Sequence, residues 1–156
     1  MKTKALGLTL TLCVLTPMVC FAADPQMGTW KLNESKSKIM PGTRQNTTAV
    51  YEAVGKQVKV TVDGTNTDGK TVHTVWTGKF NGKDYPVIGD PTSDACSYTK
   101  VNDRTLDFAI MTGGKVAFTG RIVVSADGKS RVLTMTGTTA RGEKFKNTIV
   151  YDKIPH

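Results

Sequence analysis

Apolar and polar side chains alternate with a period of two along most of the chain. Val58, Val60 and Val62 are separated by polar residues, and Leu106 and Phe108 follow the same rule. Successive side chains of a β-strand point to opposite faces, so this alternation places one apolar row on a buried face and one polar row in solvent. Helical periodicity is nearly absent after residue 22. The pattern therefore predicts an all-β protein built from half-buried strands.

Short segments that contain glycine separate these runs and predict tight turns. Asn81-Gly82 and Asp127-Gly128 are typical hairpin tips, because Asn-Gly and Asp-Gly favour the primed turns that match the twist of the flanking strands. Hairpins join nearly all neighbouring runs, so we expect an antiparallel up-and-down meander. It has about ten strands, near residues 27–33, 46–53, 57–63, 70–80, 84–88, 95–101, 105–111, 115–125, 131–139 and 144–153.

A meander of this length has two unpaired edge strands, and closing into a barrel removes them. We therefore expect a closed barrel. The long connection at residues 34–45 contains Ser, Lys, Pro and Gly, and it is compatible with a lid, a short helical turn or a plain loop. A barrel of about eight to ten strands permits a cavity for a small ligand, and an interior filled by its own side chains is the alternative.

The first residues have the three parts of a secretory signal. Lys2 and Lys4 are basic, residues 5–16 form an uncharged apolar run, and small residues end the segment at Ala22. The apolar run is shorter than the ~20 residues that a membrane-spanning helix needs. We predict a periplasmic or secreted protein with a cleaved signal at residues 1–22 and one domain at residues 23–156.

Basic residues outnumber acidic ones without forming a track. Without Lys2 and Lys4 the count is 19 basic against 13 acidic residues, a net charge of +6. The basic residues are spread along the chain, which favours a solvated surface over a nucleic-acid interface. We expect a monomer without a nucleic-acid partner, and its charge allows weak association with anionic envelope surfaces.

The chain offers little for metal, nucleotide or covalent chemistry. Cys96 is the one cysteine after residue 22, so no internal disulfide is expected, and a buried, inert thiol is favoured over a reactive one. Residues 64–71 match the P-loop pattern, but an alternating strand follows where that loop requires a helix. His73 and His156 lack ligand spacing, and no nucleophile elbow occurs. We therefore expect no metal, cofactor or catalytic residue.

Aromatic residues are the best candidates for a binding site inside the barrel. A large ring with a polar tip suits an apolar pocket that orients its ligand through a few polar groups. Simple filling of the core is the alternative for each of these rings. We expect a pocket lined by Trp76, Tyr85, Tyr98 and Phe118, in which His73 or Arg121 orients the ligand.

The segment Gly28-Thr29-Trp30 resembles the Gly-x-Trp motif on the first strand of lipocalins and the wider calycin superfamily. In that family the tryptophan closes one end of the barrel and is packed by a basic side chain from the last strand. The resemblance implies a calycin-like barrel in which Gly28 and Trp30 form a structural plug. Lys144 or Lys146 is then the candidate partner of the ring.

Longer stretches resemble a group of small secreted bacterial proteins described as lipocalin-like. They are GTWKLNESKSK (28–38), GKDYPVIGDP (82–91), SADGKSRVLTMTGT (125–138) and IVYDKIP (149–155). The chain departs from lipocalins because no late helix is expected. Its last strand also lacks the arginine with which fatty-acid-binding relatives hold a carboxylate, so fatty-acid binding is not implied.

Three classes of function follow, and they differ in where the protein contacts its ligand or partner. The first is an exported binder of a small, partly apolar molecule inside the barrel. The second is an interaction or stress module that contacts envelope components through its outer surface or residues 34–45. The third is a hydrolase or isomerase acting inside the barrel. The barrel pattern and the resemblance favour the first, and they favour a non-enzyme over an enzyme.

Overall fold

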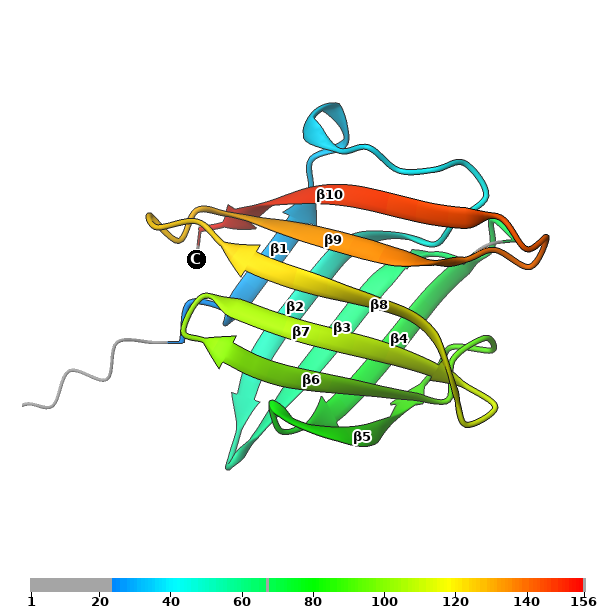
Figure 1. The fold of residues 1–156 in the computed structure, drawn as a ribbon. Helices are drawn as coiled ribbons and strands as arrows, with labels where there is room; N and C mark the ends of the chain where they lie inside the picture. The colour runs from blue at the N-terminus through cyan, green and yellow to red at the C-terminus, as the bar shows by residue number, and fades with distance from the viewer. Residues whose placement is uncertain (1–23, 67, 156) are drawn as a thin grey trace, which may run out of the picture.

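The computed structural model describes residues 24–66 and 68–155, and the predicted signal at residues 1–22 lies outside them. Ten antiparallel strands form a sheet that closes on itself (Figure 1). The all-β meander closed into a barrel is thus confirmed, and the fold is compatible with the calycin type. The strands are β1 (Gly28–Leu32), β2 (Gln45–Val54), β3 (Gln57–Thr65), β4 (Thr71–Gly78), β5 (Asn81–Ile88), β6 (Ala95–Asn102), β7 (Thr105–Thr112), β8 (Lys115–Val124), β9 (Ser130–Thr138) and β10 (Lys144–Ile154).

The barrel closes through its first strand. β1 pairs with β10 on one side and with β2 on the other, and Trp30 lies opposite Lys153 and Ala49 in these two ladders. All other strands pair with their neighbours in sequence, so each of the ten has two partners. Closure therefore removes the edges that an open meander exposes.

Within the described residues no helix is long and apolar enough to cross a membrane.

The connection from β1 to β2 covers the part of β10 that the shorter β1 leaves unpaired. After a 3-10 turn at Glu34–Lys36, Lys38 pairs with Thr148 of β10 through two backbone hydrogen bonds of 2.7 and 2.9 Å. Asn147, buried on β10, accepts a hydrogen bond of 2.8 Å from the Met40 amide. Figure 1 shows the connection passing over β10. Residues 34–45 thus contain the short helical turn and a fixed crossing segment.

The junction of β4 and β5 differs from the expectation. The turn falls at Lys79 and Phe80, and Asn81-Gly82 belongs to β5. The pairing of β5 with β6 shifts register between Asn81 and Asp84, so Gly82, with a φ of 77°, lies in a bulge. A glycine in the left-handed region serves a bulge as well as a primed turn, so the dipeptide alone does not distinguish them.

Inward-pointing side chains of successive strands fill most of the barrel. Both rows that the alternation marks as apolar, 58–62 and 106–110, face the interior. Gly120 of β8 lies against the ring of Phe108, and a Cβ at this position would come within 2.4 Å of that ring. The absence of a side chain at Gly120 therefore leaves the space that the Phe108 ring occupies.

Candidate ligand-binding cavity

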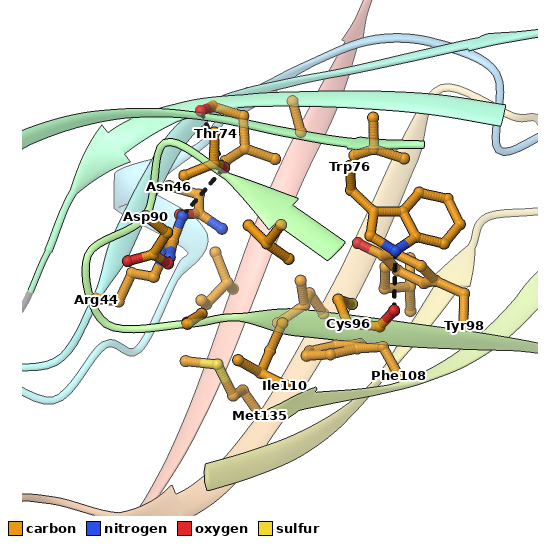
Figure 2. Close-up of a pocket in the computed structure, with 18 of the residues that line it drawn as sticks. Arg44, Asn46, Thr74, Trp76, Asp90, Cys96, Tyr98, Phe108, Ile110 and Met135 are labelled. Atoms are coloured by element: carbon orange, nitrogen blue, oxygen red, sulfur yellow. Dashed lines mark hydrogen bonds and ion pairs between the residues drawn. The ribbon is translucent and has the colours of Figure 1, made fainter. Parts of the chain in front are cut away.

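The barrel contains a cavity of about 80 Å³. In Figure 2, Trp76 and Tyr98 lie on one side of it and Arg44 and Asp90 on the other. A single water molecule needs roughly 10–15 Å³ of cavity volume. The space therefore exceeds one water site, and the alternative of a completely filled interior does not hold.

The walls of the cavity are mainly apolar. Trp76 is the centre of an aromatic cluster, in which its ring centroid lies 4.8 Å from that of Tyr98 and 6.2 Å from that of Phe80. The indole Nε1 donates a hydrogen bond of 2.8 Å to the Cys96 carbonyl, so its one polar atom is satisfied within the wall. Further apolar wall residues include Val60, Phe108, Ile110, Phe118, Leu133 and Met135.

An ion pair between Arg44 and Asp90 closes one end of the cavity, which we call the mouth. Arg44 directly precedes β2, and Asp90 lies in the loop between β5 and β6. Arg44 also donates hydrogen bonds to Asn46 Oδ1 at 2.8 Å and to the Thr74 hydroxyl at 3.4 Å (Figure 2). The Asp90 side chain is 0% exposed and that of Arg44 is 14% exposed. The pair therefore ties two connections together across the mouth.

The negative charge of Asp90 is well supported despite its burial. Its Oδ1 accepts hydrogen bonds from the amide of Thr92 at 2.9 Å and from the hydroxyl of that residue at 2.8 Å. Burial acts to raise the pKa of Asp90, but these hydrogen bonds and the Arg44 charge outweigh it and hold the pKa below its usual value. Among the described residues no other acidic side chain lines the cavity.

Trp30 closes the opposite end of the barrel, which we call the floor. Its side chain is fully buried, and its Nε1 donates a hydrogen bond of 2.9 Å to a backbone carbonyl. The guanidinium carbon of Arg131 lies 4.6 Å from the indole centroid, and Lys153 Nζ lies 5.0 Å from it. The prediction that Lys144 or Lys146 packs against Trp30 is wrong. Both lysines are exposed near the start of β10, whereas Trp30 pairs with the other end of that strand.

Arg131 of β9 is a buried cation that lines the cavity. Arg131 is only 1% exposed. Among the described residues, its Nε and Nη1 have no hydrogen-bond partner. Its guanidinium carbon lies 4.6 Å from the ring centroid of Tyr51 and 5.1 Å from that of Tyr151. Cation–π contacts contribute about 0.5–2 kcal/mol each, but a ring face provides no lone pair for an N–H group.

Cys96, Tyr98 and Tyr151 of the walls are neutral at physiological pH. Burial raises the pKa of Cys96 to about 12 and that of Tyr151 to about 12, and it raises the pKa of Tyr98 well above its usual value. The Tyr151 hydroxyl donates a hydrogen bond of 3.0 Å to the Asn46 carbonyl. Cys96 is therefore a buried thiol with little thiolate, in agreement with the favoured interpretation of the sequence.

Four aromatic residues were candidates for the pocket, and the structure brings three of them to the cavity. Trp76, Tyr98 and Phe118 line it. Tyr85 packs edge-on against Trp76 with 5.7 Å between the ring centroids, and it is not part of the lining. Three of the four rings therefore lie at one cavity, whose lining also includes residues of β2, β3, β9 and β10.

The two polar candidates, His73 and Arg121, lie on the outside of the barrel. The His73 side chain is 64% exposed, and its Nδ1 lies 2.6 Å from Asp63 Oδ1. The Arg121 side chain is 56% exposed and donates two hydrogen bonds to Asp107, at 2.6 and 2.9 Å. Neither side chain reaches the cavity, because each occupies an outward-facing position of its strand. Their expected role in orienting a ligand within the barrel does not fit this geometry.

Sequence reasoning missed the three charged residues that do line the cavity. The alternation could have identified Arg131, because it lies two positions before Leu133 and four before Met135. It therefore falls on the same apolar row of its strand. Arg44 and Asp90 lie outside the strands, where alternation carries no information about direction.

Comparison of the chain with protein-family models and with curated proteins gives no match. Among the described residues, no group of three or more His, Cys, Asp or Glu side chains could hold a metal ion.

Proposed function

We propose that this protein is an exported, lipocalin-like binder of a small, partly apolar molecule, which it holds inside the barrel. The supporting observation is the cavity of about 80 Å³, with apolar walls and a charged group at each end. Binding sites for small molecules combine such walls with a few polar groups that fix orientation. Export is the part of the proposal that rests on the sequence of residues 1–22.

The size of the cavity restricts the ligand to a compact molecule. An engineered apolar cavity of about 150 Å³ binds benzene, and sites for drug-sized ligands measure about 300–1,000 Å³. With about 80 Å³, this cavity accepts only a few non-hydrogen atoms in the conformation described. A larger ligand requires the mouth to open.

We infer that a ligand reaches the cavity through the mouth. The floor is blocked by Trp30, which is fully buried and fixed by its hydrogen bond and by two cations on its ring. At the mouth, separation of Arg44 from Asp90 frees two connections without breaking a strand pairing. Opening there disturbs less of the barrel than opening at the floor.

Native mass spectrometry of the purified protein tests this function. The protein is incubated with a panel of small alcohols and acids, and separately with extracted envelope lipids. We expect a bound species of one ligand per chain with at least one member of the panel. Ala49→Leu places extra volume in the cavity wall and should abolish binding, whereas Ala109→Leu adds the same volume on the outer face.

Two results would overturn the proposal. One is the bare protein mass in every incubation. The other is equal binding by the Ala49→Leu and Ala109→Leu proteins. A ligand bound inside the barrel must be affected by a loss of interior volume, so equal binding would place the ligand elsewhere. Thermal unfolding of both variants checks that each remains folded, because added volume in a packed core costs about 1–3 kcal/mol.

A further inference from the structure

The floor of the cavity carries a positive charge that the protein itself does not neutralise. Arg131 forms no ion pair among the described residues, and its Nε and Nη1 have no hydrogen-bond partner there. Charges that are buried in proteins are normally paired and hydrogen-bonded, because desolvation is costly. An unpaired arginine that lines a cavity is therefore a candidate binding position for an acceptor.

The groups around Arg131 add attraction for an anion. Tyr51, Tyr151 and Trp30 contribute ring faces, which hold the guanidinium in place without satisfying its N–H groups. Lys153 adds a second cation on the Trp30 ring, and among the described residues its Nζ donates one hydrogen bond, to a backbone carbonyl at 3.3 Å. The acidic residue that lines the cavity, Asp90, is already paired with Arg44 at the mouth.

We propose that the ligand is a small carboxylic acid whose carboxylate binds Arg131 at the floor and whose short apolar chain points toward the mouth. This inference rests on the proposed function and specifies the chemistry of the ligand. The planar guanidinium matches a carboxylate in geometry, and one buried cation matches one negative charge. A phosphate carries more charge and more acceptor oxygens, which the apolar walls around Phe108 and Met135 do not satisfy.

The cavity volume also sets the length of the chain. About 80 Å³ is roughly half the volume of the ~150 Å³ cavity that holds benzene. A short, unbranched acid fits this space with its carboxylate at Arg131, whereas a long-chain acid fits only with the mouth displaced. Affinity should therefore pass through a maximum at a short chain and fall as the chain lengthens.

Calorimetric titration of the purified protein tests the inference. The probes are straight-chain carboxylates from propanoate to decanoate, each compared with the primary alcohol of the same length. Hydrogen bonds to a charged group predict that the best carboxylate binds about tenfold to a hundredfold more tightly than its alcohol. Because the site is buried, the preference should persist at high salt, which would remove binding to the basic surface.

Two variants locate the preference at Arg131. Arg131→Met keeps the length of the side chain without its charge and should bring the carboxylate to the affinity of the alcohol, whereas Arg131→Lys should keep part of the difference. Lys115→Gln removes one charge from the exposed start of β8 and should change neither affinity. If Arg131→Met fails to fold, the comparison of each acid with its alcohol on the natural protein still tests whether the site prefers a carboxylate.

Each contrary outcome has a separate meaning. Alcohols that bind as tightly as carboxylates would overturn the inference and leave the proposed function intact. Loss of the carboxylate preference in Lys115→Gln, or its loss at high salt, would assign binding to the surface and overturn the inference. Absence of binding by both series, together with bare protein in the envelope-lipid incubation, would remove the proposed function itself.

Discussion

The mouth and the floor of the barrel each contain an arginine that is mostly or fully buried, but only one of the two has a counter-ion among the described residues. Arg44 at the mouth is paired with Asp90 and hydrogen-bonded to Asn46 and Thr74. Arg131 at the floor is surrounded by aromatic rings, and two of its nitrogens have no acceptor within the described chain. The first arginine has its donors used by the fold, whereas the second lines a cavity and has two buried nitrogens without an acceptor among the described residues.

The largest expected effect comes from removing the ring beneath Arg131. Trp30→Ala should lower the free energy of unfolding by about 3–5 kcal/mol, because it deletes a fully buried indole and the surface on which the guanidinium packs. Urea denaturation at neutral pH measures this loss. Trp30→Phe keeps a ring at the floor and should lose much less. A loss below about 1 kcal/mol in Trp30→Ala would show that the floor is not a supporting part of the barrel.

Breaking the ion pair at the mouth should have the next largest effect. Asp90→Ala leaves Arg44 without its counter-ion at a site that is mostly buried, and removal of one partner of a buried pair costs about 3–5 kcal/mol. Because Arg44 keeps some contact with water, we expect a loss at or just below the bottom of this range, about 2–3 kcal/mol. Urea denaturation measures the change. The thiol of Cys96, which lines the same cavity, should also react faster with a thiol reagent.

The matched control for the mouth is an ion pair on the outer surface. Asp107→Ala removes the partner of Arg121, which is well exposed, so it should change neither stability nor the reactivity of Cys96 appreciably. Equal effects of Asp90→Ala and Asp107→Ala would contradict the structural role of the pair at the mouth.

Acid should weaken the mouth without acting on the floor. The pKa of Asp90 is lower in the folded protein than in the unfolded chain, so its contribution is complete above the unfolded value of about 3.9 and disappears as the pH falls through the folded value. The difference in stability between the natural protein and Asp90→Asn should therefore be constant near neutral pH and shrink below about pH 4. Urea denaturation at a series of pH values measures it.

A difference that stays constant down to the lowest pH at which the protein folds would contradict the lowered pKa of Asp90. Arg131→Met should show the same dependence on pH as the natural protein, because Arg131 has no carboxylate partner in the described structure.

The smallest effect on stability is expected at Arg131 itself. Replacing a buried charge that lacks a counter-ion by an apolar side chain of similar length is often neutral or stabilising. We expect Arg131→Met without ligand to change the free energy of unfolding by no more than about 1 kcal/mol, because lost cation–π contacts oppose the gain. Urea denaturation of Arg131→Met and Asp90→Ala under the same conditions compares their free energies of unfolding directly. A loss as large as that of Asp90→Ala would mean that Arg131 is fully satisfied in the free protein.

The sequence was most informative where the strands are regular. The alternation at residues 58–62 and 106–110 identified the rows that face the interior as apolar, and the hairpins between the runs gave the meander. Trp76, Tyr98 and Phe118 line the cavity because large aromatic rings on inward-facing rows have few other places to lie. The bulge at Asn81-Gly82 was not separable from a hairpin turn, because both use a glycine with positive φ.

The polar part of the candidate site was predicted poorly for a physical reason. His73 and Arg121 were selected by their chemistry, but their positions on the strands point them into solvent. Arg131 was overlooked although it falls on an apolar row, since a charged residue there is unusual and its surroundings decide whether it is stable. The expected partners of Trp30 were misplaced because register between β9, β10 and β1 is a property of the sheet.

Local pattern by itself determined the all-β class, the order of the strands and the tendency of the meander to close, because alternation and turn chemistry act over a few residues. Tertiary structure alone decided that Arg44 meets Asp90, that Arg131 lies over Trp30, and that a cavity remains between them. These contacts join residues 46 to 101 positions apart, so they depend on how the closed barrel sets the register and direction of distant segments.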